Sequence, residues 1–240
     1  MRRIVQSGWG ALLFFLWGLL SLYGQAPRFS SAPGAPDSTR LKQFETRYQA
    51  AKSLQATFLE QYLENGKLVR SEAGTVFFER PGKMRWDYQR PEPNTFLVDG
   101  KYVWFYAPAD HTATRMPVKQ SADYRTPLAF LAGGSKLARV CSQVGVAEAE
   151  RAARAEDVTF ECQLRGPKAS NGIDRAVDKA YFQVAPSGEL VRLVILQEGA
   201  VRIELSFKDW EWDPRLPESL FEFVPPRGSV IVEGQLPEPL

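Results

Sequence analysis

The sequence predicts a mostly β fold in which consecutive strands pair antiparallel. Between residues 74 and 106 the chain has short runs rich in aromatic and β-branched side chains, which favour strands. Dipeptides such as Pro81-Gly82 and Asp99-Gly100 separate these runs, and they either supply a positive φ or block a ladder hydrogen bond. Side chains alternate along a strand, and here both faces are apolar. Either both faces of the sheet are covered, or one face lines a cavity.

One β domain accounts for the length of the chain. Its 240 residues contain no Gly/Ser-rich or charge-rich linker that would divide them, so we expect a single domain at residues 38–240. Residues 25–37, which include several prolines, are predicted to form a flexible leader.

The N-terminus has the pattern of a signal peptide over residues 1–24. Two arginines precede an apolar run from Trp9 to Tyr23, which is short for a membrane span, and cleavage after it would export the protein. The alternative is an uncleaved N-terminal anchor. Removal of this segment takes away two arginines and no acidic residue, which lowers the formal net charge from +2 to zero. A neutral mature protein has no electrostatic reason to bind nucleic acid or an anionic membrane.

The first predicted elements of the domain are a helix and a strand. Asp37 or Ser38 is the expected N-cap, and apolar side chains then recur at helical spacing up to Ala51. The period changes to two from Leu54 onward, which predicts a strand that ends at Asn65-Gly66. Further strands are expected at residues 74–80, 83–88, 95–98, 102–106, 112–118, 137–144, 158–164, 178–184, 189–196 and 201–210.

Three connecting segments stand out between and after these strands. Residues 126–134 predict a short helix with Thr126 as N-cap, and its almost wholly apolar sequence has to lie between the sheet and something else. Residues 147–157 are charged and Ala-rich, and they favour either a helical turn or a long hairpin loop. Residues 214–226 carry several large apolar side chains that could plug one rim of the sheet.

Cys141 and Cys162 are the only two cysteines in the chain. Each falls in a predicted strand, so a hairpin could bring them together as a disulfide in an oxidising compartment. Closing that loop would contribute roughly 3 kcal/mol in the chain-entropy model. Two buried free thiols are the alternative.

The sequence offers little for catalysis. The only histidine, His111, lies in a polar turn, and no G-x-S-x-G elbow occurs. We interpret Glu60, Glu64, Asp87 and Asp99 as ordinary surface carboxylates. No Gly-rich phosphate loop or metal-ligand spacing is present in the sequence, so we expect a non-enzyme without metal or cofactor.

Several motifs together resemble the LolA family, the periplasmic carriers of outer-membrane lipoproteins. In order, the similar residues are Gly74, Arg80-Pro81, Arg85-Trp86, Asp99-Gly100-Lys101, Trp104-Phe105-Tyr106, Pro108, Thr126-Pro127, the loop 167–172 and the ending Phe221 to Gly228. None of them is diagnostic alone, but their order and spacing cover most of residues 40–232.

The resemblance implies an incomplete antiparallel β-barrel, a half-barrel, whose apolar cavity is covered by short helices. It also implies a monomeric periplasmic carrier that needs no cofactor. Such a carrier receives triacylated lipoproteins from an ABC-type release complex in the inner membrane and delivers them to an outer-membrane acceptor. The cysteine pair and the long segment 147–157 depart from the family pattern. A sensor or regulator of envelope lipid or lipoprotein on the same fold therefore stays open as the alternative.

Acyl chains need an apolar lining, because each buried methylene contributes about 0.8 kcal/mol. The candidates for the lining are Phe78, Trp86, Leu97, Trp104 and Tyr106, and those for the lid over it are Leu128, Phe130 and Leu131. Ordinary core packing is the competing interpretation for each of them. Arg80 ends an apolar strand, where its charge needs several acceptors or a route to solvent. By resemblance, Arg80 hydrogen-bonds to the lid backbone and keeps the empty cavity closed.

Overall fold

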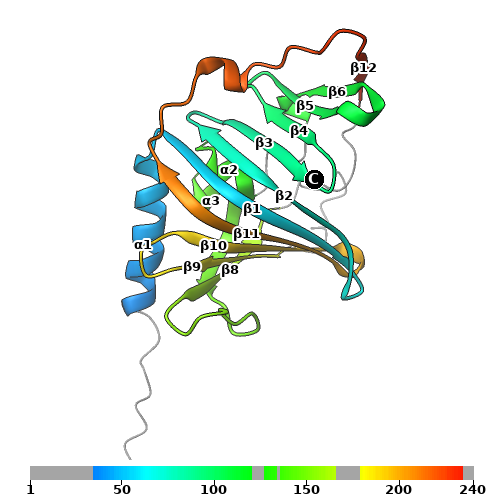
Figure 1. The fold of residues 1–240 in the computed structure, drawn as a ribbon. Coiled ribbons are helices and arrows are strands. Elements are labelled where there is room, and N and C mark those ends of the chain that lie inside the picture. The colour runs from blue at the N-terminus through cyan, green and yellow to red at the C-terminus, as the bar shows by residue number, and fades with distance from the viewer. Residues whose placement is uncertain (1–34, 121–126, 134–135, 166–178, 235–240) are drawn as a thin grey trace, which may run out of the picture. The chain divides into compact units, whose positions relative to one another are not determined.

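The computed structural model describes residues 35–120, 127–133, 136–165 and 179–234, all within a compact unit of residues 33–240 (Figure 1). The predicted signal peptide and most of the predicted leader lie outside the described residues. The helices are α1 (Ala35–Ala50), α2 (Pro127–Leu131) and α3 (Leu137–Val140), with short 3-10 turns η1 (Pro108–Asp110), η2 (Val118–Gln120), η4 (Glu198–Ala200) and η5 (Glu218–Phe221). The strands are β1 (Ser53–Glu64), β2 (Lys67–Glu79), β3 (Lys83–Arg90), β4 (Asn94–Val98), β5 (Tyr102–Ala107), β6 (Thr112–Pro117), β7 (Cys141–Val146), β8 (Val158–Leu164), β9 (Lys179–Val184), β10 (Leu190–Gln197), β11 (Val201–Trp212) and β12 (Val230–Glu233).

The described strands form one twelve-stranded open sheet in the order β12-β6-β5-β4-β3-β2-β1-β11-β10-β9-β8-β7. Neighbouring strands are antiparallel, except that β12 pairs parallel with β6. The two end strands do not pair with each other, so the barrel is incomplete. The mostly β, half-barrel class that we expected is confirmed.

Both faces of the sheet are covered. One face packs against α1, α2 and α3, which lie beside and behind the strands in Figure 1, and it carries the main core with Phe44, Phe58 and Phe130. On the other face a smaller cluster joins Leu97 and Trp104 to Phe221 of the segment that leads from β11 to β12. The prediction that this segment plugs a rim is wrong, because its apolar side chains pack on the second face of the sheet.

Three further elements differ from the predictions, and one of them is β12, where no strand was expected. Residues 137–140, which we expected to begin a strand, form α3, because Leu137 and Val140 are buried one helical turn apart while Ala138 and Arg139 between them are exposed. Helix α1 begins at Ala35, inside the predicted leader.

The segment 147–157 is a hairpin loop between β7 and β8 rather than a helical turn. Its residue Glu150 binds Arg202 through two hydrogen bonds, of 2.8 and 3.2 Å, and Arg192 at 2.9 Å. Glu204 in turn accepts two hydrogen bonds from Arg192. These ion pairs hold the loop against β10 and β11.

We expect Gly74→Ala to destabilise the fold. Gly74 faces β3 so closely that a Cβ would overlap the carbonyl oxygen of Asp87 and lie 2.9 Å from its carbonyl carbon. Backbone atoms cannot move aside cheaply, so the free energy of unfolding should fall by about 1–3 kcal/mol or more in urea denaturation. Gly145→Ala is the matched control, because a Cβ there meets nothing within 4 Å. Equal stability of the two variants would contradict the prediction.

Candidate functional site

The helix-covered face of the sheet is the candidate site. Phe78 on β2 and Trp86 on β3 lie on it, and their rings meet edge to face with centroids 6.0 Å apart. Phe58 on β1 contacts the Trp86 ring at 4.7 Å, and Phe207 on β11 at 6.2 Å completes the aromatic layer. Two of the five predicted lining residues are therefore on this face.

The other three predicted lining residues lie on the opposite face. Leu97 and Trp104 belong to the smaller cluster, and Tyr106 follows Trp104 at the same side of β5. Phe223 packs against Trp104 at 4.8 Å and against Tyr106 at 5.6 Å. A single cavity cannot be lined by all five residues, because the sheet separates the two groups. Only Phe78 and Trp86 remain candidates for it.

The predicted lid covers the helix side of the main core. We use the name lid for residues 127–133, that is α2 and the two residues after it. Phe130 and Leu131 are wholly buried, and the Phe130 ring lies 5.3 Å from Phe44 and 6.2 Å from Tyr48 of α1. The side chain of Leu128 and the predicted N-cap Thr126 lie outside the described residues. The lid is therefore held between α1 and the sheet, with its apolar side chains filling the space that a ligand would need.

Arg80 lies where β2, α1 and the lid meet. Its guanidinium donates a hydrogen bond to the carbonyl oxygen of Tyr48 in the last turn of α1. A Cβ on Gly133 of the lid would lie 2.6 Å from the guanidinium carbon, so the two residues are in close contact. Burial lowers the pKa of Arg80, and Nε is buried without a partner among the described residues. The hydrogen bond that the structure describes thus goes to α1, while the lid is contacted by packing.

A backbone hydrogen bond also fastens the lid. The N–H of Gly82, in the turn after Arg80, donates to the carbonyl oxygen of Ala132 at 2.8 Å. Gly133 has a φ of +74°, which a glycine adopts without strain and which ends the short helix as the sequence predicted.

Glu60 is not the surface carboxylate that we expected. Its side chain is only 3% exposed and accepts a hydrogen bond of 3.0 Å from the Tyr88 hydroxyl. Burial raises its pKa from 4.5 to about 7, against the opposing effect of that hydrogen bond. The alternation of side chains along β1 could have predicted this burial, because Glu60 follows Phe58 by two residues and therefore shares its face.

We expect Glu60→Gln to stabilise the protein at neutral and alkaline pH. The pKa of Glu60 is higher in the folded chain, so the folded state binds a proton more tightly and loses stability as pH rises from about 4.5 to 7. Above this range the loss amounts to about 2–4 kcal/mol. Urea denaturation at pH 4 and pH 8 should show similar stability at pH 4 and a more stable variant at pH 8. A variant that is less stable at pH 8 would contradict this prediction.

Cys141 and Cys162 form a disulfide, with Cα atoms 5.4 Å apart and a sequence separation of 21. It joins the start of β7, just after α3, to β8, and both cysteines are buried in the main core. The side chains that could take part in catalysis or metal binding are not gathered in one place among the described residues. His111 is exposed, and the described part of the chain has no group of three His, Cys, Asp or Glu residues placed to hold a metal ion.

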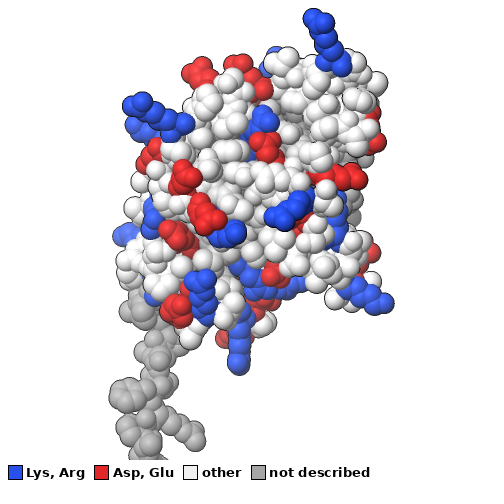
Figure 2. Space-filling view, viewed as in Figure 1, with Lys and Arg blue, Asp and Glu red and all other residues white. Residues whose placement is uncertain are grey.

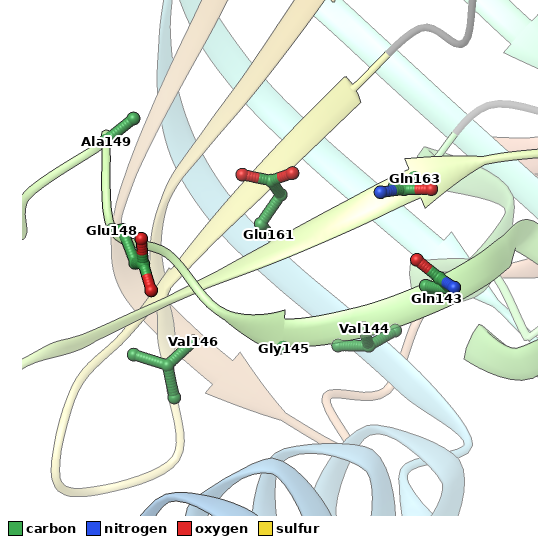
Figure 3. Close-up of a pocket in the computed structure, with 8 residues that line it drawn as sticks. All are labelled: Gln143, Val144, Gly145, Val146, Glu148, Ala149, Glu161 and Gln163. Carbon is green, nitrogen blue, oxygen red and sulfur yellow. The ribbon is translucent and has the colours of Figure 1, made fainter. Parts of the chain in front are cut away.

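An open depression of about 620 Å³ lies at the β7 edge of the sheet (Figure 3). It is lined by Gln143 on β7, by Glu161 and Gln163 on β8, and by residues of the loop between these two strands. Glu161 already pairs with Lys179 at 2.8 Å. The lining mixes polar side chains with Val144 and Val146, and the depression is open to solvent, so it would not enclose acyl chains.

The charges on the face shown in Figure 2 are interspersed, with acidic and basic side chains alternating over it. This agrees with the small formal net charge of the chain, +2, and does not suggest an electrostatic partner. No helix among the described residues is both long and apolar enough to cross a membrane.

The protein is thus of the half-barrel class, with an open and almost wholly antiparallel sheet whose aromatic inner face packs against helices. Residues 49–224 match the family described as outer membrane lipoprotein carrier protein LolA, and the chain belongs to this family. The outer-membrane lipoprotein carrier protein of Nitrosomonas europaea is 28% identical over 199 residues, which cover 81% of this chain and 89% of that protein. The carrier of the same name from Nitrosospira multiformis is 26% identical and covers 85% and 92%.

Two solved structures are similar to this chain, and the first of them supports the fold. An uncharacterised conserved protein from Thermus thermophilus superposes with a TM-score of 0.50 at 15% identity, over 83% of this chain and 100% of its own. A LolA superfamily protein from Nitrosomonas europaea gives a TM-score of 0.43 at 12% identity, over 78% and 97%.

Proposed function

We propose that this protein is a periplasmic carrier that binds the acyl chains of lipoproteins released from the inner membrane and delivers them to the outer membrane. The observation that carries the proposal is the apolar face between the sheet and the lid. Phe58, Phe78 and Trp86 form its floor, and Phe130 and Leu131 fill it from the lid side. Displacement of the lid would expose a continuous aromatic and aliphatic surface of the kind that acyl chains need.

The lid suits reversible closure because few described contacts other than apolar packing fasten it. One is the hydrogen bond from the Gly82 N–H to the Ala132 carbonyl, and the other is the packing of the Arg80 side chain on Gly133. Closure of the empty site opposes cargo binding, so cargo is held less tightly than an open face would hold it. A moderate affinity of this kind permits transfer to a tighter acceptor. Arg80 is the lid latch in this scheme, and it acts through Tyr48 and Gly133.

The proposed partners follow from this role. The cargo is triacylated lipoprotein, the donor is an ABC-type release complex of the inner membrane, and the acceptor lies in the outer membrane. The protein acts as a monomer, after cleavage of residues 1–24, and its single domain begins with α1 rather than at residue 38 as predicted. It performs no catalysis and needs no cofactor or metal for transport.

A release assay tests the proposal. Protein purified from the periplasm is incubated with spheroplasts whose newly made lipoproteins are labelled, and the soluble fraction is examined for labelled lipoprotein bound to it. Addition of outer membranes should then move the label to them. An albumin control shows how much label leaves the spheroplasts without a specific carrier. Release at the albumin level would contradict the carrier role.

The alternative is a sensor of envelope lipid or lipoprotein on the same fold. Its supporting observation is the braced end of the sheet, where the disulfide and the ion pairs of Glu150 hold β7, β8 and the loop 147–157 in place. A braced surface of this kind suits a lasting protein contact. If free lipid binds without any release of lipoprotein, and a stable complex with another envelope protein forms, the sensor replaces the carrier.

A further inference from the structure

The helix-covered face changes from apolar to polar along the strands. On β1 the buried side chains Leu54 and Phe58 are followed on the same face by Glu60 and then by the half-buried Tyr62. The exposure therefore rises toward the β1–β2 turn, where the face reaches solvent. Glu60 stands at this boundary, two residues beyond the aromatic layer.

The boundary is built from several strands. Glu72 on β2 is the direct cross-strand partner of Glu60, and Arg70 pairs with Glu72 at 2.9 Å. The Tyr88 hydroxyl on β3 donates a hydrogen bond to the Glu60 carboxyl group. Burial raises the pKa of both carboxyl groups. Like charges directly opposite each other on a sheet are unfavourable, so this arrangement is maintained at a cost in stability.

Trp86 supplies a second, independent observation. Its side chain is 2% exposed, and its indole Nε1 is buried without a hydrogen-bond partner among the described residues. A buried tryptophan N–H usually finds a partner, and leaving it unpaired costs about as much as a lost hydrogen bond. Trp86 precedes Tyr88 by two residues on the same face of β3, and the Phe58 ring contacts both, at 4.7 and 5.2 Å.

We propose that Trp86, Tyr88 and Glu60 form a polar subsite for the ester or amide group through which acyl chains join their cargo. The Trp86 N–H donates to a carbonyl oxygen of the ligand, and the Glu60–Tyr88 pair accepts an amide N–H. The hydrocarbon then extends along the aromatic layer toward the lid, and the head group lies toward the β1–β2 turn. This inference rests on the proposed carrier function and adds an orientation for the bound chains.

Two matched pairs of ligands test it with purified full chain at pH 8. Dilauroylglycerol carries ester carbonyls that its diether analogue dilaurylglycerol lacks, and a lauroyl amide carries an N–H that its N-methyl analogue lacks. Competition against a fluorescent acyl probe gives the affinity of each ligand. The hydrogen bond to Trp86 should make the diester bind about three- to tenfold more tightly than the diether. The amide should bind more tightly than its N-methyl analogue by a similar factor.

The variants separate the two contacts. Trp86→Phe should lower the affinity for the diester to the affinity for the diether. The ratio of the affinities for the amide and its N-methyl analogue should not change. The double variant Glu60→Met/Tyr88→Phe removes donor and acceptor together, so it leaves no unpaired partner, and it should abolish only the amide preference. Each preference is a ratio within one variant, so a general loss of stability does not imitate the result.

Equal affinities within each pair in the unchanged protein would overturn the subsite and leave the carrier function standing. Preferences that persist in both variants would also overturn it. Absence of binding by all four ligands, even when Arg80→Leu frees the lid, would refute acyl binding itself and the subsite with it.

Discussion

Arg80→Leu is expected to tighten acyl binding by roughly ten- to a hundredfold and to impair delivery. The Arg80 guanidinium packs directly on Gly133 of the lid, and its hydrogen bond to Tyr48 of α1 holds it in that position. Hydrogen bonds of charged groups contribute about 1.5–3 kcal/mol, and the apparent affinity of a ligand rises with the fraction of open protein. A variant that no longer closes should therefore load readily and transfer its cargo poorly.

Titration with a fluorescent acyl probe measures the first effect, and transfer of labelled lipoprotein to outer membranes measures the second. Arg115→Leu is the matched control, because Arg115 lies on the other face, where it pairs with Glu233 and stacks near Trp104. Its affinity should equal that of the unchanged protein. If Arg80→Leu binds the probe as weakly as the control does, Arg80 does not hold the lid closed.

Loss of the disulfide is expected to lower the free energy of unfolding by about 3 kcal/mol in the double variant Cys141→Ala/Cys162→Ala. The disulfide closes a loop across a sequence separation of 21, and it ties the edge strand β7 to β8. An open loop gains conformational entropy in the unfolded state, which is the main source of the effect in the chain-entropy model.

Urea denaturation of the oxidised protein, the reduced protein and the double variant checks this expectation. The reduced protein keeps both sulfur atoms, so its difference from the oxidised protein isolates the crosslink from any cavity that alanine leaves. Reductant should not affect the double variant. Oxidised and reduced protein with equal stability would show that the bond contributes nothing.

Much of the fold could be predicted because local patterns and tertiary packing agree. The period-two run from Leu54 and the turn at Asn65-Gly66 correspond to β1 and its hairpin, and the helical spacing of Phe44 and Tyr48 corresponds to α1. The all-apolar segment after Thr126 forms a buried helix, as its lack of a polar face required. These predictions needed only side-chain periodicity and turn chemistry.

The candidate site was predicted less completely. The lining prediction joined Trp104 and Tyr106 to Phe78 and Trp86, which lie on the opposite side of the sheet. The alternation of side chains shows which residues of one strand share a face. It does not show which residues of the next strand lie on the same side of the sheet. The burial of Glu60 could have been found from its spacing to Phe58, since residues two apart share a face.

Local sequence patterns were enough to predict most of the strands, the turns between them, the apolar character of both faces and the places of the lid and the cysteines in the chain. All of these depend on neighbours in the chain. The folded structure was needed to show which aromatic residues share a face, that the segment after β11 covers the second face, and that Arg80 reaches Tyr48. Such contacts join residues far apart in sequence, such as Trp104 with Phe223. Their formation depends on register, twist and packing across the whole sheet rather than on any local pattern.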